Sequence, residues 1–289
     1  MVGSRARMKA RLAGTAAVVA GCLLSLLASP AIAGDGLTYP SRTVAAAPGS
    51  TKTAAVPCPK GTHVLGGGGN LGANYGSALL SHSYPYDGRD RDSRPDDGWK
   101  ARGSALDAFV QVSASAVCAP VRPRYRQLSF EVDPTAALTD VEVPCGGQLE
   151  VVSGGSRGPV AVRQTDGRPL DHGGSGDGFE LGFDNVADDS RTVTGFAICT
   201  DAIDVSYAVA GDYAAPARDR GVGSAQCPPA APNVVGGGQR NGGASFGAAR
   251  IVQDYRVPFA SFTTWWAVLD NAAPTSFLFT VTASCVPDL

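Results

Sequence analysis

The stretch that decides the fold runs from Cys227-Pro228 through Val234-Val235-Gly236-Gly237-Gly238 and Trp265-Trp266 to Ala283-Ser284-Cys285. Its landmarks occur twice more in the same order: a cysteine, a glycine-containing apolar segment, an aromatic residue and a closing cysteine. The earlier glycine segments are Val64-Leu65-Gly66-Gly67-Gly68 and Val151-Val152-Ser153-Gly154-Gly155. Landmarks that recur three times in a fixed order indicate an internal repeat, and they predict three copies of one structural unit.

An aromatic residue precedes each closing cysteine at a nearly constant distance. Trp99, Phe179 and Trp266 lie 19, 20 and 19 residues before Cys118, Cys199 and Cys285. We therefore expect these three rings to be equivalent and buried. Neighbouring residues of a strand face opposite sides, so this alignment predicts that Trp265 points outward.

An outward Trp265, together with Phe259 and Phe262 in the preceding segment, would form an aromatic surface. Such a surface could stack on a sugar ring, contact a partner protein or merely cover the edge of a sheet. These three residues are the candidate ligand-binding residues. If the facing were reversed, Trp266 would take the surface role.

The N-terminal segment predicts export. Residues 1–33 contain a basic region from Arg5 to Arg11, an apolar run from Leu12 to Leu27 and the small-x-small sequence Ala31-Ile32-Ala33. This pattern is typical of a cleaved signal peptide, and its apolar run is too short to favour a membrane span. We expect a secreted, extracellular protein. The alternative is a lipoprotein anchored at Cys22, which ends a lipobox-like Val19-Ala20-Gly21-Cys22.

Charge limits the partners. The chain has 24 Lys and Arg against 26 Asp and Glu, and the signal segment removes four basic residues and no acidic one. The mature chain then has 20 basic and 26 acidic residues, a net charge near −6. Nucleic acids and anionic membrane surfaces are bound through clustered positive charge. The composition therefore argues against both as partners.

The cysteine count predicts a disulfide framework. Removing Cys22 with the signal leaves six cysteines, one pair in each repeat. An even count in an exported chain indicates disulfides, and the repeat favours Cys58–Cys118, Cys145–Cys199 and Cys227–Cys285. Each bridge would stabilise the fold by roughly 4 kcal/mol in the chain-entropy model.

We expect no metal ion and no cofactor. No C-x-x-C is present, and the three histidines have no ligand spacing, which argues against zinc. The acidic loop Asp87–Asp97 begins like a calcium loop, but it lacks the required glycine and distal glutamate. A solvated hairpin tip is the favoured interpretation, and calcium binding by this loop stays open.

The rest of the chain is typical of an all-β protein. Residues 127–132 and 203–209 alternate apolar and polar side chains, and 37 glycines and 20 prolines punctuate the sequence. We expect one β domain over 34–289, with units over about 34–121, 122–201 and 202–289. Three small disulfide-closed sandwiches in a row are the alternative. The glycine runs precede no helix, so we expect close backbone approach or bulges rather than phosphate binding.

Residues that carry chemistry are few. No G-x-S-x-G is present, and the histidines (His63, His82 and His172) occupy no repeated position, so we expect them on the surface or in turns. Glycoside hydrolysis needs a pair of carboxylates. The candidate pairs are Asp96 with Asp97, Glu131 with Asp133, and Glu180 with Asp184. Nothing in the sequence selects among them, and no catalytic residue is assigned.

The first unit has Cys58-Pro59-Lys60-Gly61, a glycine-rich strand and a closing Ala116-Val117-Cys118. The other units depart at Cys145-Gly146-Gly147 and Cys227-Pro228-Pro229-Ala230. With these marks the chain resembles a recurrent kind of actinobacterial exported protein. More distantly, its plan is similar to the vitelline membrane outer layer protein family. That resemblance implies a secreted β-prism of three Greek-key sheets about a pseudo-three-fold axis. It implies carbohydrate binding or transfer and carries over no catalytic residue.

These observations favour a secreted, non-enzymatic binding or structural protein, with an extracellular glycan or a cell-envelope component as the candidate partner. Two other classes remain. One is a secreted glycan-active hydrolase or transferase, which would need two carboxylates in one cleft. The other is a protein-binding or inhibitor module that uses the variable loops. The oligomeric state does not follow from the sequence.

Overall fold

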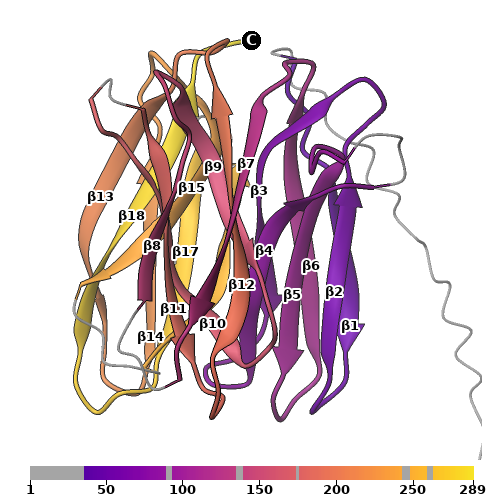
Figure 1. Ribbon diagram of the computed structural model, residues 1–289. Coiled ribbons are helices and arrows are strands. Elements are labelled where there is room, and N and C mark those ends of the chain that lie inside the picture. The colour runs from indigo at the N-terminus through magenta and orange to yellow at the C-terminus, as the bar shows by residue number, and fades with distance from the viewer. Residues whose placement is uncertain (1–35, 89–92, 135–138, 174–175, 243–247, 259–262) are drawn as a thin grey trace, which may run out of the picture.

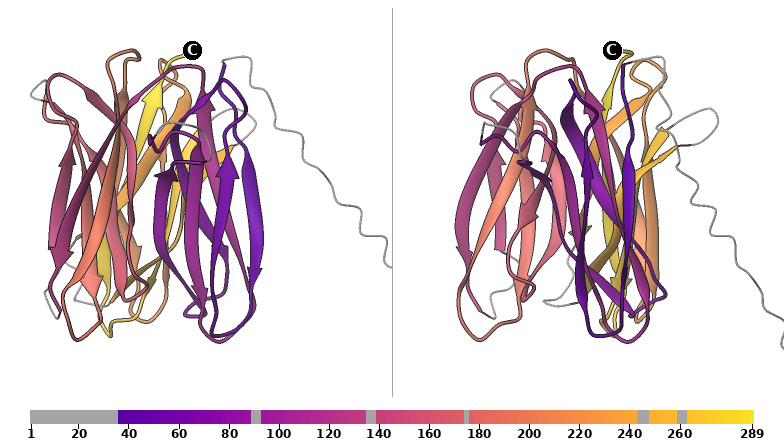
Figure 2. Two further views of the ribbon diagram at one scale, coloured as in Figure 1. Left: turned by 45° about the vertical axis from the view of Figure 1, so that its right-hand side comes forward. Right: turned by 90° about the vertical axis from the view of Figure 1, so that its right-hand side faces the viewer.

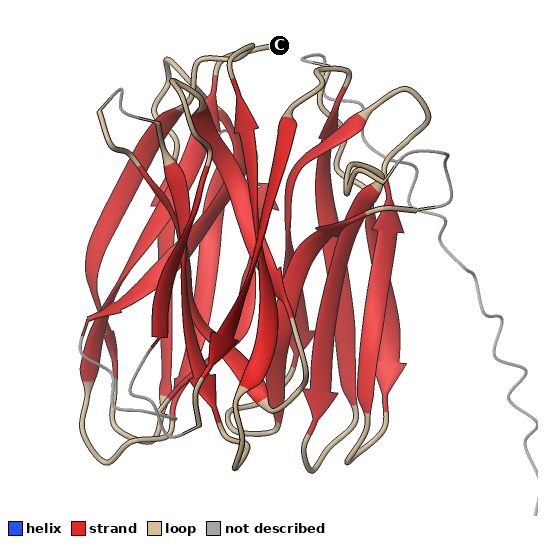
Figure 3. Ribbon diagram, in the orientation of Figure 1, coloured by secondary structure: helices blue, strands red, loops and turns tan. Residues whose placement is uncertain are grey.

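The computed structural model describes residues 36–88, 93–134, 139–173, 176–242, 248–258 and 263–289. These residues form eighteen β-strands and no helix (Figures 1 and 3). The all-β prediction is therefore confirmed. No helix among them has the length and apolar character needed to cross a membrane. The signal segment lies outside the described residues.

Each repeat contributes six strands. The first repeat contains β1 (Ser41–Ala46), β2 (Thr51–Pro57), β3 (His63–Gly72), β4 (Ala78–Tyr86), β5 (Gly98–Ala105) and β6 (Val110–Ala119). The second contains β7 (Arg124–Val132), β8 (Thr139–Pro144), β9 (Glu150–Arg157), β10 (Val162–Leu170), β11 (Gly178–Asn185) and β12 (Arg191–Thr200). The third contains β13 (Ser206–Ala215), β14 (Arg220–Gln226), β15 (Asn233–Gly242), β16 (Ala249–Pro258), β17 (Thr263–Asn271) and β18 (Phe277–Val286).

The strands form three six-stranded antiparallel sheets, and every sheet combines two repeats. Sheet A has the order β1-β6-β3-β16-β17-β14, sheet B β2-β5-β4-β9-β12-β7, and sheet C β13-β18-β15-β10-β11-β8. The first, sixth and third strands of one repeat thus continue into the fourth, fifth and second strands of another. Because all three repeats follow this rule, the fold is a three-unit, β-prism-like arrangement, as predicted.

Each repeat is also a two-layer sandwich, because its two half-sheets belong to different sheets and pack against each other. In the first repeat, β3 and β6 of sheet A contact β5 of sheet B. Figure 2 shows the strands of all repeats aligned roughly along one axis of the molecule, pointing up and down. Separate sandwiches in a row, the alternative from the sequence, would not share sheets. That alternative is wrong.

The repeats meet at three narrow seams, where the third strand of one repeat pairs with the fourth strand of another. The seam in sheet B has the single pair Ser83↔Ser156, and that in sheet C has Gly167↔Gln239. The seam in sheet A has Gln253↔Asn70 and Asp254↔Gly69. With so few backbone pairs, close packing at the centre of the molecule must supply much of the cohesion between repeats.

The glycine runs lie where the repeats meet at these seams. A Cβ on Gly68, Gly155 or Gly238 would approach a backbone oxygen of the neighbouring repeat, and the distance would be well under the 3.0 Å that real Cβ atoms keep. Two residues earlier in the first repeat, a Cβ on Gly66 would likewise approach Val235 O of the third repeat too closely. The expectation of close backbone approach is confirmed.

In each repeat, the glycine one residue before this seam glycine covers a buried aromatic ring. A Cβ on Gly67, Gly154 or Gly237 would collide with Trp99, Phe179 or Trp265. The third equivalent ring is therefore Trp265, not Trp266. Trp265 is 1% exposed, whereas Trp266 is partly exposed on the outer face of sheet A. The prediction that Trp265 points outward is wrong.

The error arises from one hairpin. The connection between β5 and β6 has four residues, 106–109, whereas the equivalent connections 186–190 and 272–276 have five. Counting back from the closing cysteine therefore aligns Trp99 with the residue after its true counterpart. Phe179 and Trp265 each lie 20 residues before their cysteines. Phe259 and Phe262, the other two candidate ligand residues, lie outside the described residues.

The buried rings explain a further difference among the repeats. Trp99 Nε1 donates to Ser83 Oγ at 2.7 Å, and Trp265 Nε1 donates to Asp254 Oδ1. In the second repeat the ring is Phe179, which has no N–H, and the position of the acceptor is taken by Gly167. A buried indole N–H requires an acceptor, so the two positions vary together.

The predicted disulfide pairing is the one the structure contains: Cys58–Cys118, Cys145–Cys199 and Cys227–Cys285. Each bridge joins the segment after a repeat's second strand to its sixth strand. Because those strands belong to different sheets, each disulfide crosslinks the two layers of one repeat. The bridging cysteines face the core, where Cys118, Cys199 and Cys285 are fully buried.

Candidate binding groove

The outer face of sheet B carries aromatic side chains from two repeats. Tyr84 on β4 comes from the first repeat, and Phe196 on β12 comes from the second. Their rings stack with centroids 5.9 Å apart and an interplanar angle of 15°. The two rings are far apart in the sequence, and they meet because β4 pairs with β9 at the seam and β9 pairs with β12.

Two cations lie over this aromatic surface. Lys100 Nζ is 4.4 Å from the centre of the Tyr86 ring, and the Arg157 guanidinium carbon is 5.9 Å from the centre of Phe196. Burial raises the pKa of Tyr84 and of Tyr86 above its usual value. Both phenols are therefore neutral hydroxyls at physiological pH, which can donate and accept hydrogen bonds.

Two adjoining clefts open on this face. One has a volume of about 300 Å³ and is lined by Tyr84, Tyr86, Phe196, Lys100, Arg157 and neighbouring residues. The other has a volume of about 400 Å³. Ser93, Pro95 and Gln127 line both clefts. The two clefts therefore adjoin each other, and together we call them the sheet B groove. Volumes of this order are typical of small-molecule binding sites.

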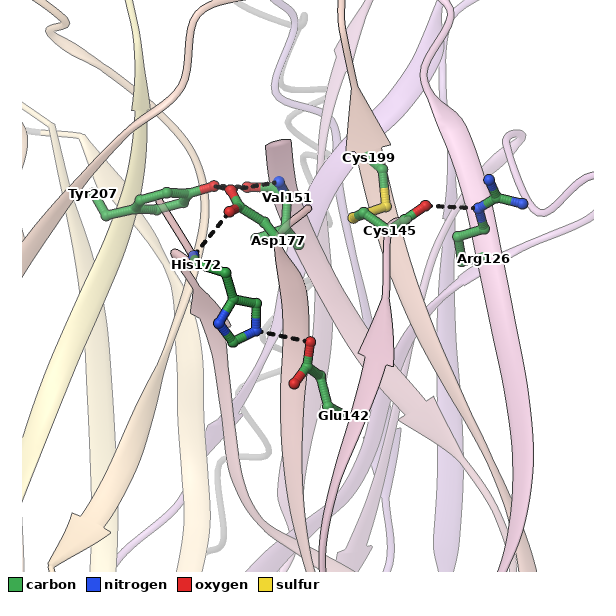
Figure 4. Close-up of a disulfide and its surroundings, with 8 residues drawn as sticks. All are labelled: Arg126, Glu142, Cys145, Val151, His172, Asp177, Cys199 and Tyr207. Carbon is green, nitrogen blue, oxygen red and sulfur yellow. Dashed lines mark hydrogen bonds and ion pairs between the residues drawn. A yellow bond between two sulfur atoms is a disulfide. The ribbon is translucent and has the colours of Figure 1, made fainter. Parts of the chain in front are cut away.

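The larger cleft is rich in arginine. It is lined by Arg94 of the loop before β5, Arg122 of the connection between repeats, and Arg124 and Arg126 of the edge strand β7. All four side chains are exposed, and none of the described residues that line this cleft is acidic. Arg124 pairs with Asp201 at 2.8 Å in an exposed contact, and Arg126 Nε donates to Cys145 O at 3.1 Å (Figure 4).

The equivalent face of sheet C also carries charged side chains, and several of them form ion pairs with one another. Arg168 lies 3.2 Å and Arg240 3.6 Å from opposite oxygens of Glu180. His172 Nε2 is 3.0 Å from Glu142 Oε1 (Figure 4). These charged side chains of sheet C therefore balance one another, and acidic as well as basic groups lie on this face.

Beside the second disulfide, Asp177 ties two repeats together. Its Oδ2 lies 2.7 Å from the Tyr207 hydroxyl of the third repeat, and its Oδ1 accepts from His172 N at 3.1 Å (Figure 4). Tyr207 also lies 2.8 Å from Val151 O, and burial is the main reason that its pKa is raised. A cleft of about 130 Å³ adjoins this contact. Because Asp177 is already satisfied by internal donors, we assign this contact a structural role.

The sequence singled out three carboxylate pairs, and the structure gives their members separate environments. Asp96 lies 3.0 Å from His63 Nδ1, Asp97 accepts from Gly88 N, and Asp133 accepts from Ser190. Glu131 is exposed on β7, Glu180 pairs with the two arginines of sheet C, and Asp184 is buried. None of the three pairs forms two carboxylates that face one cleft in the described structure.

A different pair comes together, and the sequence did not indicate it. Asp140 Oδ1 and Asp166 Oδ2 both point at Gly182, where they lie 3.0 and 2.7 Å from the position of a Cβ. Burial raises the pKa of Asp166 to about 7, and burial together with Glu180 raises that of Asp140. No short motif marks this pair, because β8 and β10 are brought together only through β11.

The histidines differ from one another. His172 is partly exposed in the loop after β10, and His63 begins β3. His82 is 1% exposed, so the expectation of a surface position is wrong for it. Its ring nitrogens lie 3.2 Å from Ser156 Oγ and 3.1 Å from Pro159 O. Burial lowers its pKa to about 4, so His82 is a neutral group that joins β4 to the second repeat.

Among the described residues, no group of three or more His, Cys, Asp or Glu side chains is placed to hold a metal ion. Part of the Asp87–Asp97 loop, including Asp90 and Asp92, lies outside the described residues, so the structure does not test calcium binding by this loop. The sheet B groove is therefore the best candidate site. In comparisons with known protein families and with curated proteins, nothing matches this chain.

Proposed function

We propose that this chain is a secreted, non-enzymatic protein that binds an extracellular glycan in the sheet B groove. The observation that carries the proposal is the pair of partly exposed rings, Tyr84 and Tyr86, in one cleft of about 300 Å³ whose wall also contains Phe196, which is 3% exposed. Sugar rings have apolar C–H faces that can lie on aromatic rings, and hydroxyls that require polar partners. The groove offers both, because Gln127 and Ser93 lie at its centre.

Export is supported by two independent features. The first 33 residues have the pattern of a signal peptide. The three disulfides also fit an oxidising compartment, since such bonds persist outside the cytosol. The distant resemblance to the vitelline membrane outer layer protein family is compatible with a secreted glycan-binding role.

A binding role is favoured over catalysis by the lining of the groove. Of the described residues that line its two clefts, Asp87 is the only acidic one. Acid–base cleavage of a glycosidic bond normally needs two carboxylates on either side of the bond. The groove therefore holds cations and rings suited to binding, and lacks a described pair of acids for hydrolysis.

A glycan hydrolase is the second candidate function, favoured by Asp140 and Asp166 in sheet C. One of these carboxyls has a pKa near neutrality, as a general acid needs. Against this role, Asp166 is only 3% exposed, so a substrate could contact it only after the surface opened. Release of reducing sugar by the wild-type protein, and its loss in Asp140→Asn, would favour hydrolysis.

The binding proposal is tested with the mature protein and a panel of soluble and insoluble polysaccharides. We expect at least one polysaccharide to bind, and Tyr86→Ala to weaken that binding by about 5- to 100-fold, a loss similar to that of one stacking platform. Phe109→Ala is the matched control, because Phe109 is 77% exposed in the turn between β5 and β6, outside the groove. Failure of wild type to bind any polysaccharide, or equal binding by Tyr86→Ala, would overturn the proposal.

A further inference from the structure

The two halves of the sheet B groove differ in chemistry. The aromatic half contains Tyr84, Tyr86 and Phe196, with Lys100 and Arg157 lying against the rings. The other half is lined by four arginines, and none of its described lining residues is acidic. Because Ser93, Pro95 and Gln127 belong to both halves, one extended ligand can contact the two together.

We infer that the ligand of this groove is an acidic polysaccharide, whose sugar rings lie in the aromatic half and whose carboxylate or sulfate groups lie against the arginines. This inference rests on the proposed function, since it specifies which class of glycan binds there. The guanidinium group suits such a ligand, because its N–H donors match both oxygens of a carboxylate, or two of a sulfate, in one plane.

The charge of the groove is opposite to that of the mature chain, whose net charge is near −6. A local cluster of cations on an acidic protein attracts an anion at one place while the remaining surface repels it. Arg122, Arg124 and Arg126 come from the connection between repeats and the start of the edge strand β7, so they are concentrated at one end of the groove.

A nucleic acid is a less suitable occupant. Double-stranded DNA carries about one charge per 1.7 Å of its axis, and its binding is dominated by contacts with many phosphates. The cationic half of the groove is confined to a cleft of about 400 Å³, and the acidic character of the mature chain opposes contacts beyond it. Acidic polysaccharides with one charge per sugar have wider spacing, which suits a short cluster followed by aromatic rings.

The experiment compares polymers that differ only in charge. Polygalacturonate is paired with its fully methyl-esterified form, and dextran sulfate with dextran, and binding of the mature protein is measured by calorimetry at several salt concentrations. We expect at least one acidic polymer to bind about tenfold or more tightly than its neutral partner, with affinity that falls as salt rises. The two pairs distinguish carboxylate from sulfate as the preferred group.

The variant Arg122→Gln/Arg124→Gln should reduce that preference to about threefold or less and leave the binding of the neutral polymer unchanged. Arg191→Gln is the matched control, because Arg191 forms an exposed pair with Asp189 outside the groove. Folding of each variant is checked by thermal unfolding. Arg122, Arg124 and Arg191 are all exposed, so both variants should fold.

The outcomes separate this inference from the proposed function. Equal, Tyr86-dependent binding of acidic and neutral polymers would overturn the inference and leave glycan binding intact. Binding of double-stranded DNA as tight as that of the acidic polymers, with no effect of Tyr86→Ala, would replace both by a general polyanion site. No binding of any polymer would overturn both.

Discussion

The seams within sheet B and sheet C have different titratable groups at the same backbone position. His82 follows the bulge of β4, and Asp166 follows the equivalent bulge of β10. Each is buried against the neighbouring repeat: His82 lies beside Ser156, and Asp166 accepts a hydrogen bond from Asn241 N. The fold therefore fixes where the group lies and how deeply it is buried, and leaves its identity free.

The next position along the same seams behaves in the opposite way. Gly155 in sheet B and Gly238 in sheet C are both glycine, because a Cβ there would meet the backbone of the facing strand. Steric exclusion by backbone is the same in every repeat, whereas side-chain chemistry is not. Positions that recur thus form the scaffold, and positions that differ, such as Lys100 and Glu180, give the outer face of each sheet its own character.

The largest expected effect tests the shared part of this comparison. Gly155→Ala and Gly238→Ala should each destabilise the protein by more than about 4 kcal/mol or prevent folding, since each forces a seam apart. The two effects should be similar, although the side chains on the outer faces of sheets B and C differ. Unfolding in denaturant, or the yield of secreted protein, measures the loss.

Gly72→Ala is the matched control. Gly72 ends β3, and the nearest atom to its added Cβ would be a side-chain carbon of Gln111 at 3.8 Å. This change should alter the free energy of unfolding by less than about 1 kcal/mol. A tolerated Gly155→Ala beside a damaging Gly238→Ala would mean that the two seams are not equivalent.

The third sheet extends the comparison to the buried rings. Trp265→Ala should cost about 3 to 5 kcal/mol, the range for emptying a buried aromatic site, and it also leaves Asp254 without its indole donor. Trp266→Ala should cost less than Trp265→Ala, because Trp266 is partly exposed whereas Trp265 is fully enclosed. Denaturant unfolding of both variants decides the order. Greater damage from Trp266→Ala would reverse the assignment of the two rings.

The repeat itself made much of the fold predictable from the sequence. Cysteines at fixed places in each copy indicated the disulfides, and glycine runs without a following helix indicated close backbone approach. The exchange of strands between repeats was not predictable. Nothing in the sequence of a third strand indicates whether it pairs with the fourth strand of its own repeat or with that of another repeat. The misassigned Trp265 depended on one residue missing from the hairpin 106–109.

The candidate groove was beyond sequence reasoning for a different reason. Tyr84, Arg122 and Phe196 have no common motif and lie in different segments. They meet only because β4 and β9 pair across a seam, and because the segment before β7 passes the loop at Ser93. The sequence did indicate that an aromatic surface and variable loops would carry function, but it placed that surface on Trp265, which is buried.

The smallest expected effects test the position at which the two seams differ, His82 in sheet B and Asp166 in sheet C. Asp166 should lower stability as pH rises, and His82 should lower it as pH falls. The folded-state pKa of Asp166 is about 7, above the unfolded value near 3.9, so the folded protein holds an extra proton between them. The contribution of Asp166 to the free energy of unfolding is fully present below about pH 4 and is lost as pH rises through 7. His82 has a folded pKa of about 4, below the unfolded 6.5, so its contribution is lost as pH falls from about 6.5 to 4.

Each unit of pKa shift corresponds to 1.36 kcal/mol, so one group changes stability by about 2 to 3 kcal/mol over the accessible range. From pH 5 to pH 8, wild type should lose about 3 kcal/mol more stability than Asp166→Asn, whose amide oxygen can still accept from Asn241 N. Asp254, also with a pKa of about 7, and the neighbouring Asp140 and Glu180 remain in that variant, so the stability of Asp166→Asn can still change with pH.

From pH 6.5 to 4.5, wild type should lose about 2 kcal/mol more stability than His82→Gln, since burial and Arg102 both oppose protonation of His82. Denaturant unfolding at these four pH values measures both differences. Parallel pH profiles of stability for wild type and both variants would show that the pKa values of these buried groups do not differ between the folded and unfolded states.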